Sequence, residues 1–398
     1  MTSATRAGKR ATGRFASLDG LRGVAAIIVV FTHFLVVVPD VSDYIVGKQE
    51  PLPGEPTWWL VHTPLRVLLL GNEAVMVFFI MSGFVLMLPM LGRPQTIRGT
   101  LAYYARRSLR LYLPVWGSLI LAVGLSLLVP RDPDFGSSWL ATHSEPTLPG
   151  VIKDAVLVLG VTNLNSPLWS LTWEVWFSLF LPLFVWIFRV ARVDRWWLIA
   201  APLLVLASAA SQLDVVRELL PGAWLTVPLL RYMPVFLLGM ILAARLDTLN
   251  RWARALGRGA WTFVILATVV LVLLPPILGP ARFGTDTESA GYWFMTITGA
   301  CLVVLLALLH AGFSRSLERP VPSWLGARSF SLYLVHEPII VSAALLIGAS
   351  TWWPWLLWLP VVVAIILLAT TAFFSGVERP AHRIARWVGV RVGGTART

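Results

Sequence analysis

The sequence predicts an all-α membrane protein, a polytopic bundle of about ten spanning helices. Its 398 residues are 57% hydrophobic and only 13% charged, and the mean hydropathy is +0.76. Apolar runs long enough to cross a hydrocarbon core of ~30 Å recur along the whole chain. The Lys and Arg residues fall in short segments between these runs, which is typical of a multi-pass membrane protein.

Ten apolar segments, taken in chain order, give the predicted spans. The first follows a basic tail and has no small-residue cleavage site after it, so we expect a retained helix and not a signal peptide. The spans form a transmembrane domain at 20–376 between a basic N-terminal tail, 1–19, and a basic C-terminal tail, 377–398. Their expected bounds are 20–39, 66–90, 111–129, 167–188, 196–211, 227–244, 260–278, 291–312, 329–348 and 355–376.

An even number of spans places both termini on one side of the membrane. Twenty-five of the 32 Lys and Arg residues lie on that side, so the positive-inside rule predicts that both termini and the 91–110 loop are cytoplasmic. We therefore expect a protein of the cell inner (plasma) membrane. The opposite loops carry few cations and several aromatic residues suited to a membrane interface, namely Trp58, Trp59, Trp139, Trp224, Trp352, Trp353 and Trp355.

Composition also narrows the functional class. The formal net charge of +12 does not indicate nucleic-acid binding, because the cations form no long patch. The single cysteine, Cys301, excludes an internal disulfide and a cysteine cluster for metal. A transporter or flippase is the main alternative, and the lack of internal repeats counts against it. A structural scaffold ranks last, because it gives polar residues inside the spans no purpose.

Arg22 and His33 lie eleven residues apart in the first span, within LRGVAAIIVVFTH. A helix turns about 100° and rises about 1.5 Å per residue, so the two side chains share a face roughly 16 Å apart. With Arg22 at the cytoplasmic surface, His33 lies near the midplane of the membrane. An ionisable group there is costly and usually functional. The pair indicates a path that leads inward along one helix face.

Further polar residues are expected in the outer half of the bundle. Glu174 and Ser170 share one face of a span that is entered from the extracytoplasmic side. Glu73 and Arg231 enter their spans from the same side. Two alternatives stay open for the charged residues: Arg231 forms a structural ion pair with a glutamate, or the carboxylates serve His33 or a substrate.

Three arginines, Arg106, Arg107 and Arg110, precede the third span in YYARRSLRLYLP. Their ordinary interpretation is a collar of positive charge that sets topology. The functional alternative is a phosphate clamp, because guanidinium groups match phosphate oxygens and this side faces nucleotide-bearing cofactors. Arg22 on the neighbouring helix would add a further donor.

Six motifs follow one another along nearly the whole chain. They are SLDGLRGVAAIIVVFTHF, VFFIMSGF at 77–84, RRSLRLYLP at 106–114, PLWSLTWE at 167–174, LGARSFSLYLVHEPI at 325–339 and VERP at 377–380. Each motif alone is weak evidence for a family, but the ordered set resembles the membrane-bound acyltransferase 3 family. The resemblance implies transfer of an acyl group, often acetyl from acetyl-coenzyme A, onto a hydroxyl of a carbohydrate or a glycosylated small molecule.

The resemblance also implies roles for particular residues. Arg22 and His33 match the family's essential arginine and histidine. Arg106 and Arg110 match its cytoplasmic arginine motif, and Glu174 matches its glutamate. The implied co-substrate is acyl-coenzyme A, with no metal. The sequence departs from the family's usual pattern before the Phe-Phe pair, where Ala74, Val75 and Met76 stand and an acid, Glu73, comes earlier.

The chemistry expected of these residues is acyl transfer from a thioester to an alcohol. The neutral imidazole of His33 can take the hydroxyl proton or hold the acyl group, and both alternatives stay open. With Glu174 it is expected to be catalytic. The expected ligands of acyl-coenzyme A are Arg22, Arg106, Arg107 and Arg110. The candidates for acceptor binding are Glu73, Ser170, Arg231 and His336.

His336 is the one other histidine that matches a motif, and a structural role in holding Glu337 is at least as plausible for it as catalysis. No SGNH-type hydrolase domain is attached, so we expect this domain to finish the reaction or to pass the acyl group to a separate extracytoplasmic partner. The remaining histidines are expected at the surface or at a helix end, and they are His62, His143, His310 and His382.

Overall fold

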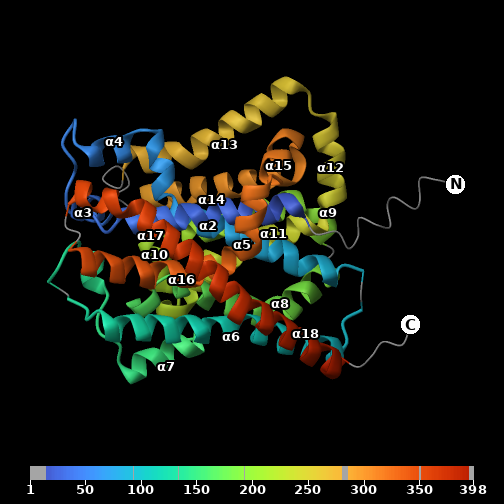
Figure 1. Cartoon of the computed structure of the whole chain (residues 1–398). Coiled ribbons are helices and arrows are strands. Elements are labelled where there is room, and N and C mark those ends of the chain that lie inside the picture. Colours follow the sequence, from blue (N-terminus) through green and yellow to red (C-terminus); the bar gives the residue numbers. More distant parts are fainter. Residues whose placement is uncertain are drawn as a thin grey trace.

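The computed structural model describes residues 15–92, 94–132, 134–191, 193–279, 286–348 and 351–393. Within these ranges the chain forms helices joined by loops, and it forms no strand. The all-α class predicted from the sequence is therefore confirmed. The long helices lie side by side along a common direction, and the start of the first described helix and the end of the last one lie at the same end of the bundle (Figure 1).

The long helices make up the bundle, and short helices lie at its ends. The long ones are α2 (Ala16–Leu35), α5 (Gly71–Met87), α6 (Ile97–Leu128), α8 (Leu168–Val190), α9 (Val193–Ala210), α11 (Ala223–Ala244), α13 (Arg258–Leu278), α14 (Asp286–Leu309), α16 (Pro320–Ile347) and α17 (Trp352–Phe373). The shorter ones are α3 (Pro39–Ile45), α4 (Pro56–His62), η1 (Pro64–Leu69), η2 (Leu88–Met90), η3 (Leu140–Thr142), α7 (Leu148–Val156), η4 (Asn163–Asn165), α10 (Asp214–Leu219), α12 (Leu246–Ala255), α15 (Ala311–Leu317), η6 (Phe374–Glu378) and α18 (Arg379–Gly393).

All ten predicted spans correspond to helices. In the part of the chain that the structure describes, nine helical stretches are long and apolar enough to cross a membrane, and the fifth predicted span forms the shorter apolar stretch Trp196–Ala210 of α9. The third span was predicted to begin at residue 111, but α6 already begins at Ile97. The apolar run marks only the part of this helix that suits lipid, whereas the arginine-rich stretch before it is also a good helix former.

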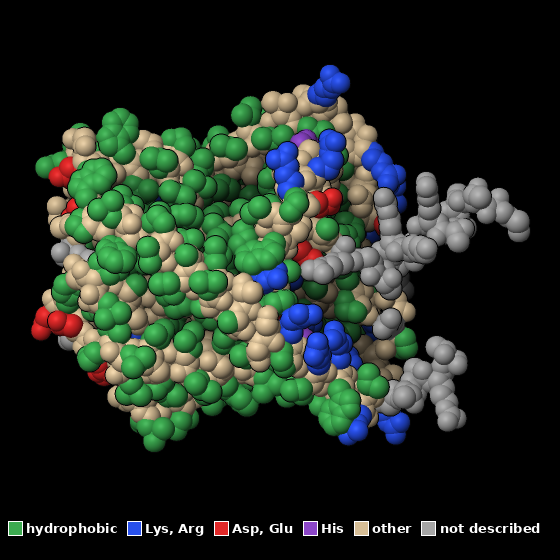
Figure 2. Space-filling view, viewed as in Figure 1, with side chains coloured by type: hydrophobic (Ala, Val, Ile, Leu, Met, Phe, Trp, Pro, Cys, Tyr) green, Lys and Arg blue, Asp and Glu red, His purple; other side chains and the backbone are tan. Residues whose placement is uncertain are grey.

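The segment expected to be a C-terminal tail is largely helical. A π-helical turn, Phe374–Glu378, leads from α17 into α18, and α18 packs along α6. We call the end of the bundle where α2 begins and α18 ends the terminal end, and the end with α3, α4 and the 129–147 loop the far end. Figure 2 shows hydrophobic side chains over the middle of one face and Lys and Arg gathered towards the terminal end. This distribution fits a multi-pass membrane protein.

Glycines permit two close helix crossings in the core. Gly23 of α2 meets Gly326 of α16, and a methyl group on Gly326 would lie 1.8 Å from a backbone oxygen of α2. At the second crossing Gly83 of α5 meets Phe236 of α11, and a methyl group on Gly239 of α11 would lie 1.9 Å from the backbone oxygen of Ile80 in α5. Small residues are what allow helix backbones in membranes to approach so closely.

We expect Gly239→Val to destabilise the protein by at least about 1–3 kcal/mol, because the clash is with backbone and no side chain can move aside. The matched control is Gly124→Val on α6, where an added methyl meets no atom within 4 Å. Thermal melting of both variants in the same detergent measures the difference. Equal melting temperatures would contradict the assigned role of this crossing.

Candidate active site

A cavity of about 510 Å³ lies between α2, α5, α6, α8 and α16. Its size falls in the range of small-molecule binding sites. We call it the arginine cavity. Its charged lining residues are Asp19, Arg22, Arg107, Arg110, Glu174 and Glu378.

Glu174 and Arg107 form an ion pair in the cavity wall. Arg107 Nη2 donates to Glu174 Oε1, and Ser82 Oγ donates to the same oxygen at 2.6 Å. Arg107 Nε donates to Ser178 Oγ at 2.9 Å. The exposed fractions of the Arg107 and Glu174 side chains are 17% and 18%. The charge of Arg107 is therefore largely offset before any ligand binds.

Arg110 and Arg22 carry the positive charge that an anionic ligand would meet. Arg110 lies three residues after Arg107 on the same face of α6, and it is exposed. Arg22 lies across the cavity on α2, with one guanidinium nitrogen 3.9 Å from Asp19. Guanidinium groups from two helices thus face one space, as a phosphate clamp requires.

Arg106 does not line the cavity, which differs from the expectation that it joins the clamp. Its side chain crosses Gly389 of α18, where a methyl group would lie 2.1 Å from Arg106 Cγ. Successive residues of a helix point about 100° apart, so Arg106 faces α18 when Arg107 and Arg110 face the cavity.

The cavity extends inward along α16 as far as Tyr333. The hydroxyl of Tyr333 donates to the Pro167 carbonyl oxygen at 2.9 Å and lies 2.8 Å from Ser170 Oγ. His336 follows three residues later, about 4.5 Å further along the helix axis. The rings of Tyr333 and His336 are 5.9 Å apart. The cavity therefore ends one helical turn from a second polar group.

His33 and His336 are hydrogen-bonded across α2 and α16, with His33 Nδ1 2.9 Å from His336 Nε2. His336 Nδ1 lies 3.0 Å from the Leu332 carbonyl oxygen, which can only accept. In neutral His336 the proton is therefore on Nδ1, and Nε2 accepts from His33 Nδ1. This assignment follows from the hydrogen-bonding partners and leaves the Nε2 lone pair of His33 available as a base or nucleophile.

A third histidine, His143, reaches this pair from the 129–147 loop. It is 3% exposed, and its Nε2 lies 3.0 Å from Glu337 Oε1. Its Nδ1 lies 3.0 Å from the Trp139 carbonyl oxygen, so both ring nitrogens of His143 have hydrogen-bonding partners. Ser166 Oγ donates to the same carboxylate oxygen.

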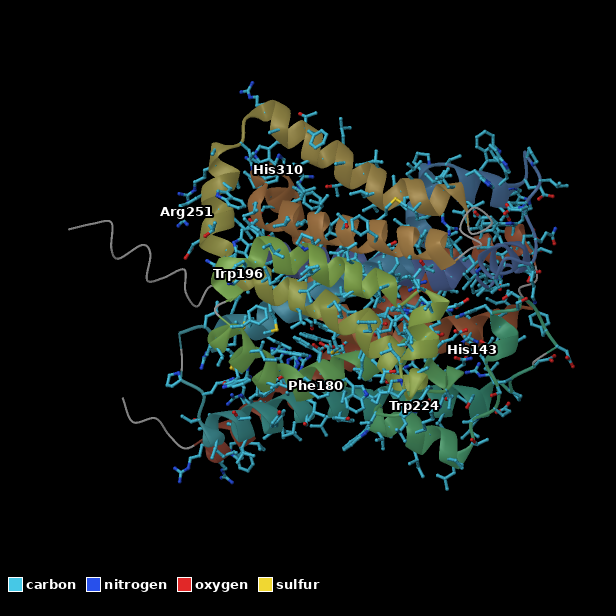
Figure 3. The ribbon with its side chains drawn as sticks, turned by 180° about the vertical axis from the view of Figure 1, so that it is seen from behind. His143, Phe180, Trp196, Trp224, Arg251 and His310 are labelled. Carbon is cyan, nitrogen blue, oxygen red and sulfur yellow. The ribbon has the colours of Figure 1, made fainter. Side chains whose placement is uncertain are left out.

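The residues joined by these contacts form one group. Figure 3 shows one of them, His143, towards the far end of the bundle. We call the group the histidine cluster, and it consists of His33, Trp139, His143, Ser166, His336 and Glu337.

Glu174 lies in the arginine cavity, although the sequence placed it in the outer half near His33. The reason is the early start of α6. It carries Arg107 about 15 Å into the bundle from Ile97, where the partly buried carboxylate of Glu174 can pair with it. No hydrogen bond links Glu174 to His33 in the described part of the chain.

Glu73 and Arg231 are also held away from His33 and from each other. Tyr292 donates to Glu73 at 2.6 Å. Arg231 donates to Ser211 and to Gln212, both at 3.3 Å, and lies over the ring of Trp293. Among the described residues Arg231 forms no ion pair with a glutamate, so that alternative for it is wrong.

Sequence reasoning missed His143 and underrated Glu337. His143 stands in a polar loop beside prolines, which gave no sign of burial, and the Glu337 signal was only its place in the HEPI motif. His382, expected at the surface, lines the arginine cavity and lies 3.9 Å from Glu378. His310 caps α15 by accepting from the Phe313 N–H, as expected for a helix end.

Comparisons with known proteins identify the family of this chain. The acyltransferase 3 model, described as an acyltransferase domain, matches residues 15–374. The chain is 27% identical over 367 residues to the acyltransferase MdmB of Streptomyces mycarofaciens, covering 85% of this chain and 82% of that protein. No solved structure gives a significant match. The matched range includes the histidine cluster and all the charged lining residues of the arginine cavity except Glu378.

Proposed function

The chain belongs to the acyltransferase 3 family, and from this we propose that it moves an acyl group, acetyl in the simplest case, from cytoplasmic acyl-coenzyme A to a hydroxyl of a carbohydrate or glycosylated small molecule. One observation carries the proposal. The arginine cavity ends one helical turn from the His33–His336 pair. In this proposal the terminal end is cytoplasmic and the membrane is the bacterial inner membrane.

The donor would enter the arginine cavity from the terminal end. Its phosphates would meet Arg110 and Arg22, because charge-assisted contacts from guanidinium groups suit phosphate oxygens. The uncharged pantetheine arm would extend past the neutralised Arg107–Glu174 pair towards Tyr333. This direction brings the thioester towards His33.

The reaction would use His33 as a general base. Its Nε2 takes the proton of the acceptor hydroxyl, the hydroxyl oxygen attacks the thioester carbonyl carbon, and the C–S bond breaks. The departing thiolate then takes the proton back from His33 and leaves as coenzyme A thiol. His336 holds the Nδ1 proton of His33, which keeps Nε2 unprotonated at the start. General base catalysis typically contributes about 10²–10⁴ in rate.

Release of free thiol from acetyl-coenzyme A tests this function. We expect purified protein to release thiol in the presence of methyl glucoside and to form the acetylated sugar, which mass spectrometry detects. A base mechanism also predicts no initial burst of thiol when the alcohol is omitted. Thiol release at the rate of a protein-free control would contradict the acyltransferase reaction, and a one-equivalent burst would make His33 a covalent carrier.

For the donor site we expect Arg110→Ala to weaken acetyl-coenzyme A binding roughly 10–100-fold, because a charge-assisted phosphate contact is lost. Arg106→Ala is the matched control, since Arg106 precedes the same span but packs on α18. Direct titration of both purified variants measures the difference. Equal affinities would show that the three arginines act only as a topological collar.

A further inference from the structure

His33 and Trp139 lie side by side outside the arginine cavity. His33 and Trp139 are both partly exposed, yet neither lines that cavity. Their rings lie 5.6 Å apart with an angle of 30° between the planes. The backbone N–H of Trp139 donates to Ser42 Oγ at 2.9 Å, which ties the backbone of this residue to α3 at the far end. A partly exposed aromatic ring thus adjoins the base.

Glu337 has an oxygen atom for which the described part of the chain supplies no donor. Its side chain is 0% exposed, and Oε2 has no hydrogen-bond partner there. The other oxygen is taken by Ser166 and by His143. A buried carboxylate oxygen without a donor is costly, and a ligand hydroxyl would satisfy it. Glu337 directly follows His336, the residue that is hydrogen-bonded to His33.

We propose that Trp139 and Glu337 form an acceptor subsite for a ring with an apolar face and two neighbouring hydroxyls, such as a pyranose. The proposal rests on the function proposed above and names the place and chemistry of its acceptor. The ring stacks on Trp139, one hydroxyl donates to Glu337 Oε2, and the neighbouring hydroxyl meets His33 Nε2. Donor and acceptor then approach His33 from opposite ends of the bundle.

Two small alcohols test the subsite with acetyl-coenzyme A as donor. Cyclohexane-1,2-diol has an apolar ring and two neighbouring hydroxyls, and cyclohexanol has one. We expect wild-type kcat/KM to be roughly 10–100-fold higher for the diol, as a charge-assisted hydrogen bond allows. In Glu337→Gln this preference falls towards the statistical factor of about two that two equivalent hydroxyls would give, while acetyl-coenzyme A affinity stays unchanged.

Trp139 affects both alcohols in the same way. Trp139→Leu should lower kcat/KM for both by roughly fivefold and leave their ratio unchanged, and Trp139→Phe should restore most of the loss. The matched control is Trp353→Leu, whose side chain is 70% exposed and should have no effect.

The outcomes separate the subsite from the underlying function. Equal use of both alcohols by the wild type, or a diol preference that survives Glu337→Gln, would overturn the subsite while the transferase function stands. Thiol release that does not exceed the protein-free rate with either alcohol would contradict both.

Discussion

Replacing His33 with Ala lowers kcat for acetyl transfer by about 10²–10⁴, the usual contribution of a general base. The Kd for acetyl-coenzyme A should stay unchanged, because His33 does not line the arginine cavity where the donor would bind. Thiol release by the purified variant, together with donor titration, measures both quantities. Near-normal turnover would show that His33 is not the base and only forms a structural hydrogen bond with His336.

A matched pair of variants at His336 tests how His33 is held. His336→Phe keeps an aromatic ring but cannot accept a hydrogen bond from His33 Nδ1. In this variant His33 can carry its proton on Nε2 instead, where it cannot act as a base. His336→Gln offers a carbonyl oxygen that can accept the hydrogen bond from His33 Nδ1. We therefore expect Gln to retain more of kcat than Phe, whereas equal losses would make His336 a packing residue only.

The fold was predictable because lipid imposes a simple requirement. A chain that crosses a hydrocarbon core must satisfy its backbone internally over a long apolar stretch, and such stretches are visible in the sequence. Each of the ten predicted segments is a helix, and Arg22 and His33 share α2 as the spacing indicated. The start of α6 was not predictable in this way, because residues 97–110 are helical without being apolar.

The site was less predictable because its contacts depend on helix rotation and on loop paths. Arg106 and Arg107 are adjacent in the sequence, but their side chains point about 100° apart on the helix. Arg106 therefore faces α18, whereas Arg107 faces the cavity. His143 belongs to a loop, and a loop has no regular repeat from which the direction of a side chain can be predicted. The partner of Glu174 could not be inferred until the depth of Arg107 was known.

Replacing Glu174 with Ala should cost about 1–3 kcal/mol in the free energy of unfolding, because it leaves the partly buried guanidinium of Arg107 without a counter-charge. The double variant Arg107→Met with Glu174→Met removes both charges and should recover most of that stability. Thermal melting and chemical unfolding in detergent measure the two effects. A stable Glu174→Ala variant would contradict the structural importance of the pair.

The double variant also decides where Glu174 acts in the reaction. The Arg107–Glu174 pair lines the arginine cavity, where the donor is proposed to bind, and it forms no hydrogen bond with His33. We therefore expect the double variant to have a raised KM for acetyl-coenzyme A and little change in kcat at saturating donor. If Glu174 instead acted with His33, kcat would fall by about 10² or more in a protein of restored stability. Geometry favours the first outcome, because Ser82 and Arg107 already occupy the carboxylate oxygen nearest to them and His33 is held by His336.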